Sequence, residues 1–76
     1  MTKKSAHPLA DLTAYRRARQ ENQSEFWSRF GVTQSGGSRY ESGRALPKPV
    51  AMLVQAFADG IIDDEVLAKL RKRIAR

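Results

Sequence analysis

Polar side chains suited to hydrogen bonding recur at helical spacing between residues 33 and 43. Thr33 can cap the start of a helix there, because its hydroxyl oxygen can accept from a free backbone N–H of the first turn. The polar residues that such a helix would turn outward are Gln34, Ser35, Ser38 and Arg39. Amide, hydroxyl and guanidinium groups donate and accept hydrogen bonds, so this face favours recognition of a polar partner.

Another short helix is predicted directly before this one. The apolar residues that recur in it at helical spacing are Phe26, Trp27 and Phe30. Gly31 ends that helix, since glycine tolerates the positive φ common at a helix C-terminus, and Val32 follows as a buried residue. Gly43 closes the second helix. Two helices joined by a glycine turn form the layout that sets a recognition helix into the major groove of DNA.

The sequence contains no pattern that predicts catalysis or metal binding. It has no serine, histidine and aspartate arrangement, no phosphate-binding glycine loop and no zinc spacing. His7 is the only histidine and falls in a polar N-terminal stretch. The acidic run Asp63, Asp64 and Glu65 is better explained as the start of a helix, where it complements the helix dipole. We therefore expect no enzyme, no metal, no cofactor and no small-molecule ligand.

Size and charge narrow the class of partner. The chain has 76 residues, a formal net charge of +6 and a pI near 10.3, which favours a polyanion such as nucleic acid. Without cysteine it forms no disulfide. No apolar run approaches the ~18 residues of a transmembrane helix, and no signal-peptide region is evident. We expect a soluble protein of the cytoplasm, associated with the nucleoid and not with a membrane.

Hydrophobic periodicity predicts one all-α domain of five helices. Residues 1–7 are polar and basic and form a flexible arm, and residues 8–76 form the domain. The first helix is expected from Pro8 to about Gln20. Residues 44–48 form a loop, and Pro47 and Pro49 lie on either side of the start of the fourth helix. The fourth helix ends at Gly60. The fifth, over residues 63–75, has an acidic start, a basic end and an apolar stripe, and it either caps the core or pairs with a second copy.

The same residues resemble a known family. They match, without a gap from Arg16 to Gly43 and more loosely through residues 47–60, the phage repressor and Cro family of helix-turn-helix proteins, the xenobiotic-response-element type. The residues that carry the resemblance are Arg16, Gln23, Gly31, Val32, Thr33, Gln34, Ser35, Ser38, Arg39, Tyr40, Glu41 and Gly43. It implies a compact five-helix repressor-like bundle that binds double-stranded DNA as a homodimer on a palindromic operator.

The resemblance also implies roles for particular residues. Base edges would be contacted by Gln34, Ser35 and Arg39, with Ser38 nearby. The DNA backbone would be contacted by Asn22, Gln23, Thr33, Ser42, Arg44 and Lys48. Such phosphate contacts set register and affinity, whereas glutamine and arginine can read adenine and guanine. Gln23 would also buttress Gln34, and Arg16 and Glu41 would form a partly buried salt bridge.

Three positions depart from the family pattern. Trp27 stands where the family has a small residue, and Gly37 stands where it has a branched apolar residue. Because the two positions face each other across the turn, we expect the indole to fill the space of the missing side chain. Glu21 stands where the family mostly has leucine.

The leading hypothesis is a sequence-specific transcriptional regulator, most simply a repressor that occludes polymerase, in a phage, plasmid or prokaryotic setting. One alternative is an antitoxin that shares this fold and whose main partner is a toxin. Another is a basic amphipathic surface that binds anionic membranes through residues 63–75.

Overall fold

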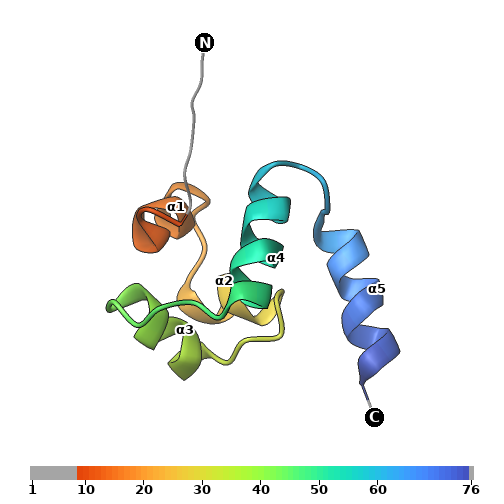
Figure 1. Ribbon diagram of the computed structural model, residues 1–76. Coiled ribbons are helices and arrows are strands. Elements are labelled where there is room, and N and C mark those ends of the chain that lie inside the picture. The colour runs from red at the N-terminus through yellow and green to blue at the C-terminus, as the bar shows by residue number, and fades with distance from the viewer. Residues whose placement is uncertain (1–8, 76) are drawn as a thin grey trace.

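In this computed structural model, the structure describes residues 9–75, and within that range it is all-α, as predicted (Figure 1). The helices are α1 (Leu12–Ala18), α2 (Gln23–Ser28), α3 (Gln34–Glu41), α4 (Lys48–Ala58) and α5 (Asp64–Ile74). The predicted basic arm, residues 1–7, lies outside the described residues, as does Pro8. No helix within residues 9–75 is long and apolar enough to span a bilayer.

Two helix starts differ from the prediction. α1 begins at Leu12 and not at Pro8, because the Asp11 carboxylate accepts from the backbone N–H of Ala14 at 3.0 Å and so caps the helix. α4 begins at Lys48, a residue that the sequence predicts to lie in the loop. The start of α4 falls between two prolines: Pro47 is its N-cap residue, and Pro49 lies in the first turn, where a missing N–H leaves no bond unmade.

Local hydrogen bonds fix both ends of the turn between α2 and α3. Asn22 and Glu25 form a capping box at the start of α2, with reciprocal side chain to backbone bonds of 2.7 and 2.8 Å. Thr33 Oγ1 accepts from the backbone N–H of Gly36 at 3.0 Å and caps α3. Between them, Gly31 has a φ of +78°, a left-handed conformation that favours glycine.

The core is an aromatic cluster behind this turn. Phe26 and Trp27 are completely buried, and their rings meet edge to face with centroids 5.1 Å apart. Phe30, two residues after the end of α2, packs edge to face against Phe26 and also against Phe57 of α4. The core therefore anchors α2, the helix against which α3 packs.

A buried arginine fastens α5 to the rest of the domain. Arg29 is only 9% exposed, and its guanidinium donates two bonds of 2.6 Å to the Glu21 carboxylate and one of 2.7 Å to Asp64. Arg71 of α5 returns a bond of 2.7 Å to the backbone carbonyl of Arg29. Within α5 only Leu67 is buried. The helix is thus held by one apolar anchor and a set of charge-assisted hydrogen bonds.

The same cluster explains why a carboxylate is tolerated at position 21. Hydrogen bonds from Arg29, and then from Arg19, lower the Glu21 pKa to about 2 despite partial burial. The Arg19 and Arg29 guanidinium carbons also lie 4.6 and 4.8 Å from the centroid of the Phe57 ring. Ionic and cation–π contacts therefore support this turn at a position where the family mostly has leucine.

Candidate nucleic-acid interface

α3 packs against α2 (Figure 1). Polar side chains of α3 lie on its solvent-exposed face. Gln34, Ser35 and Arg39 are exposed, and Ser38 is half-buried. Because these side chains follow the Thr33 cap within two turns, one short helix carries all four candidates for base contact. Contact of these four side chains with bases stays a prediction.

The Gln34 side chain is held by a hydrogen bond to the neighbouring helix α2. Its Nε2 donates a hydrogen bond of 2.6 Å to Oε1 of Gln23, the first residue of α2. Gln23 Nε2 donates in turn to Glu41 Oε1 at 3.2 Å. The buttress implied for Gln23 is thus present as a hydrogen bond, and it continues into the end of α3.

Glu41 is the centre of this network. Arg16 donates to both carboxylate oxygens, from Nε at 2.8 Å and from Nη2 at 2.9 Å. Thr13 Oγ1 donates to Oε1 at 3.0 Å, and Trp27 Nε1 donates to Oε2 at 2.8 Å. The Arg16 and Glu41 side chains are only 10% and 5% exposed, so this ion pair is largely shielded from water.

The charge state of Glu41 follows from these donors. Burial raises its pKa, but the hydrogen bonds from Arg16, Trp27, Gln23 and Thr13 outweigh burial and lower the pKa to about 2. The Glu41 hydrogen bond likewise raises the pKa of Arg16. Glu41 is therefore a carboxylate near neutral pH and can only accept hydrogen bonds.

Trp27 and Gly37 lie in direct contact between α2 and α3. A Cβ atom added at Gly37 would overlap Cδ1 and Cγ of the indole and would lie only 2.6 Å from Nε1. No Cβ atom fits there unless the ring or the helix moves. The absent side chain thus lets the buried indole sit against the α3 backbone and reach Glu41.

Of the six residues expected at the DNA backbone, Gln23 belongs to the network around Glu41, and the other five fall into two groups. Asn22, Thr33 and Ser42 already make local hydrogen bonds, the first two as helix caps and Ser42 to the carbonyl of Ser38 at 2.9 Å. Arg44 and Lys48 are exposed on the segment that leads from α3 into α4. They are the two cations for which the family resemblance implies phosphate contact.

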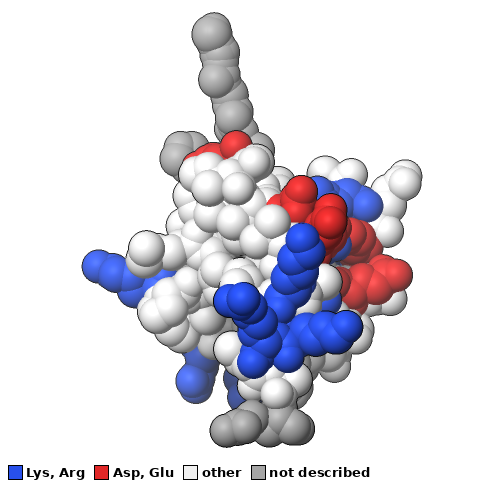
Figure 2. Space-filling model, turned by 90° about the vertical axis from the view of Figure 1, so that its right-hand side faces the viewer, with Lys and Arg blue, Asp and Glu red and all other residues white. Residues whose placement is uncertain are grey.

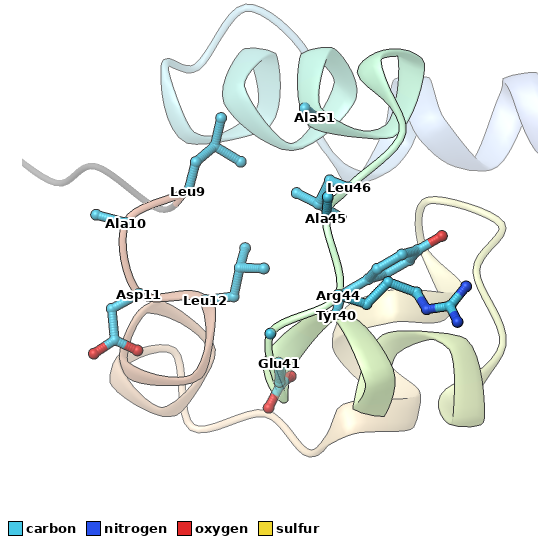
Figure 3. A pocket seen from close by; sticks show the side chains of 11 residues that line it. Leu9, Ala10, Asp11, Leu12, Tyr40, Glu41, Arg44, Ala45, Leu46 and Ala51 are labelled. Carbon is cyan, nitrogen blue, oxygen red and sulfur yellow. The ribbon is translucent and has the colours of Figure 1, made fainter.

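A cavity of about 440 Å³ opens between the start of α1, the end of α3 and the loop before α4 (Figure 3). Leu9, Leu12 and Leu46 supply much of its apolar lining. Its two carboxylates are already used, since Asp11 caps α1 and Glu41 binds Arg16. Residues 9–75 contain no group of three potential metal ligands.

The C-terminal end of α5 forms a positively charged surface. With α5 turned toward the viewer, Figure 2 shows Lys and Arg side chains gathered on this face, with Asp and Glu side chains beside them. The first turn of α5 carries Asp64 and Glu65, and the last turn is basic. The basic residues there are Arg71, Lys72 and Arg73.

Sequence reasoning missed the buried Arg29 and the hydroxyl of Thr13. Arg29 reads as one of many surface cations until its partners Glu21 and Asp64, 8 and 35 residues away, are brought beside it. A signal was available for the first partner, because Glu21 replaces an apolar family residue and so demands a cation nearby. Asp64 was interpreted only as part of a helix start.

Comparison with known proteins agrees with this geometry. Residues 13–56 match the profile of the RsaL-like helix-turn-helix domain. A solved structure of the quorum-sensing repressor RsaL from Pseudomonas aeruginosa is similar, with 46% sequence identity, a TM-score of 0.76, and coverage of 87% of this chain and 98% of that one. No curated protein matches this chain significantly. Since the profile spans more than half of the chain and the identity is high, the protein belongs to the RsaL-like family of helix-turn-helix proteins.

Proposed function

We propose that this protein represses transcription by binding a palindromic double-stranded DNA operator as a symmetric dimer. The observation that carries the proposal is the exposed polar face of α3, capped by Thr33 and packed against α2. The likeness to a quorum-sensing repressor supports the same regulatory class for this non-enzymatic protein. The docking would follow that of phage repressors and Cro, with α3 in the major groove of DNA at the nucleoid.

Base reading is assigned to the outward side chains of α3. Arg39 would donate two bonds to a guanine edge, and Gln34 would bond an adenine edge, while Ser35 and Ser38 make shorter contacts. Asn22, Gln23, Thr33, Ser42, Arg44 and Lys48 would contact the backbone. Together these contacts would place α3 in one register on each half-site.

The dimer would form through α5. Val66, Leu70 and Ile74, spaced four residues apart, are 38%, 44% and 78% exposed, which leaves an apolar stripe along one face. A two-fold axis that pairs α5 with its copy in antiparallel orientation would cover both stripes. It would also bring the acidic first turn of each helix toward the basic last turn of the other. Charge and apolar area thus favour the same arrangement.

Selection from a random pool of DNA duplexes tests the operator proposal. We expect a palindrome whose half-sites lie about one helical turn apart, roughly 34–36 Å, and footprinting should protect both halves. Arg39→Ala should abolish enrichment of one base pair in each half-site. Failure of the folded protein to enrich any sequence would refute the proposal.

Sedimentation equilibrium tests the dimer. Leu70→Asp, which places a charge on the exposed stripe, should shift the protein toward monomer and weaken binding to the full palindrome more than to a half-site. Lys69→Ala, one residue away and outside the stripe, is the matched control and should leave the association constant nearly unchanged. Equal association by the protein and by Leu70→Asp would exclude α5 as the interface.

A further inference from the structure

Gln34 is connected to Glu41 through Gln23 by two hydrogen bonds, and in each of them the donor lies on the Gln34 side: Gln34 donates to Gln23, and Gln23 donates to Glu41. Glu41 can only accept, so Gln23 must turn its NH2 group toward Glu41 and its Oε1 toward α3. Gln34 must then turn its own NH2 group toward Gln23. Oε1 of Gln34 is then the amide atom that remains for a bond to DNA, because Gln34 is exposed at the start of α3.

We propose that Glu41 is a positioning residue for base recognition: through Gln23 it fixes which atom of the Gln34 amide faces DNA, and so which base Gln34 reads. This inference rests on the proposed function, because Gln34 must contact a base edge. An outward Oε1 together with the second N–H of Nε2 complements the N6 donor and N7 acceptor of adenine. The reversed amide would turn its NH2 group outward in place of Oε1, and the two N–H groups would complement the O6 and N7 acceptors of guanine.

The donors around Glu41 allow one substitution to reverse the direction of the hydrogen bonds between Glu41, Gln23 and Gln34. Oε2 accepts from Arg16 Nε and Trp27 Nε1, two N–H groups that cannot become acceptors. Oε1 accepts from the Thr13 hydroxyl and the Gln23 amide, which can both turn round, as well as from Arg16 Nη2. In Glu41→Gln the new NH2 group would therefore occupy the Oε1 side, and Gln23 would turn its oxygen toward it.

A second variant reverses the polarity while keeping the Arg16–Glu41 ion pair. In Gln23→Lys the ammonium group has donors only, so it can donate to Glu41 and to Gln34 at once. Gln34 must then turn its oxygen inward and its NH2 group outward. This variant is needed because removal of a charge from a largely buried ion pair can prevent folding.

The matched control removes a donor to the same oxygen, Oε1 of Glu41, and leaves the direction of the Gln23 and Gln34 hydrogen bonds unchanged. Thr13→Val removes the hydroxyl that donates to Oε1, but it leaves Glu41 charged and Gln23 in place. Valine has nearly the same shape as threonine, and Thr13 lies on α1, away from the outward face of α3. It should therefore lower stability without changing base preference.

The experiment is selection of bound duplexes from a random DNA pool, with circular dichroism melts to show that each variant is folded. Gln34→Ala first identifies the base pair that Gln34 reads, as the position where preference is lost. At that position the protein and Thr13→Val should prefer adenine, whereas Gln23→Lys and any folded Glu41→Gln should prefer guanine. A good bidentate contact predicts that each preference is about tenfold or more.

The outcomes separate this inference from the function on which it rests. A change of preferred base in Gln23→Lys, with none in Thr13→Val, supports the positioning role. An unchanged base in folded Gln23→Lys, or loss of preference without gain of guanine, overturns it even though the protein still selects an operator. If the unaltered protein selects no sequence, it is the proposed function that fails.

Discussion

The contact between Trp27 and Gly37 predicts that a single methyl group destabilises this protein. Gly37→Ala should gain about 1 kcal/mol from helix propensity. The added Cβ would overlap the indole, however, and the completely buried ring has little room to move. Overpacking of this kind costs about 1–3 kcal/mol or more, so we expect a net loss of stability.

The neighbouring glycine supplies a matched control. A Cβ at Gly36 would lie 3.1 Å from Thr33 Oγ1 and 3.3 Å from Val32 Cγ1, distances that a shift of a few tenths of an ångström relieves. Gly36→Ala has the same propensity gain, so its stability should stay within about 1 kcal/mol of the unaltered protein. Thermal melts should separate the two variants clearly, since each kcal/mol corresponds to about 4–8 °C in a domain of this size.

A double-mutant cycle measures the contact itself. Trp27→Ala should destabilise by about 3–5 kcal/mol because it opens a cavity. It also removes the bond from Nε1 to Glu41. Gly37→Ile should destabilise through overlap, but combined with Trp27→Ala its side chain would enter the vacated space and recover part of the loss. Additive effects, or a Gly37→Ala variant as stable as Gly36→Ala, would refute the reasoning.

Three further outcomes are expected. Arg39→Ala should relax preference at one operator base pair by about 1–3 kcal/mol in competition binding, and full retention of discrimination would contradict α3 as the reader. Arg44→Ala should instead weaken operator and random DNA alike and reduce the slope of log K against log salt by roughly one, as titrations at several salt concentrations would show. Glu21 and Glu41 have folded pKa values near 2, below their ordinary 4.5, so the stability they contribute is present above pH 4.5 and lost as pH falls toward 2. Melts should therefore show a steep fall in Tm across that range, worth up to about 3 kcal/mol for each carboxylate, and a flat Tm would count against the ion pairs.

The helix-turn-helix segment was predictable because its signals are local. Thr33 caps the helix that it immediately precedes, and Gly31 takes the positive φ that its turn requires. The start of α1 was mistaken because two local signals compete there, and the Asp11 cap prevails over Pro8. Pro47 and Pro49 lie on either side of the start of α4, as predicted, and only the assignment of Lys48 to the loop is wrong, by one residue.

The ionic contacts could be predicted only where the family resemblance supplied the partner. Arg16 and Glu41 were paired on that basis, whereas Glu21 indicates only that some cation lies nearby and does not identify Arg29 as that cation. Its burial depends on Glu21 and Asp64, which only the folded chain brings together. The bond from Trp27 to Glu41 was also missed, since the indole was considered only for its volume.

The position of Trp27 makes the protein its own optical reporter. It is the only tryptophan in the chain, and its ring touches the backbone of α3 at Gly37. If α3 opened away from α2, water would reach the indole, and its emission would move to longer wavelength. α5 contains no aromatic residue, so its detachment would leave that signal largely unchanged while helical circular dichroism fell. Fluorescence and circular dichroism recorded on one unlabelled sample can therefore tell loosening of the reading helix from release of α5, and addition of DNA would show which of the two it suppresses.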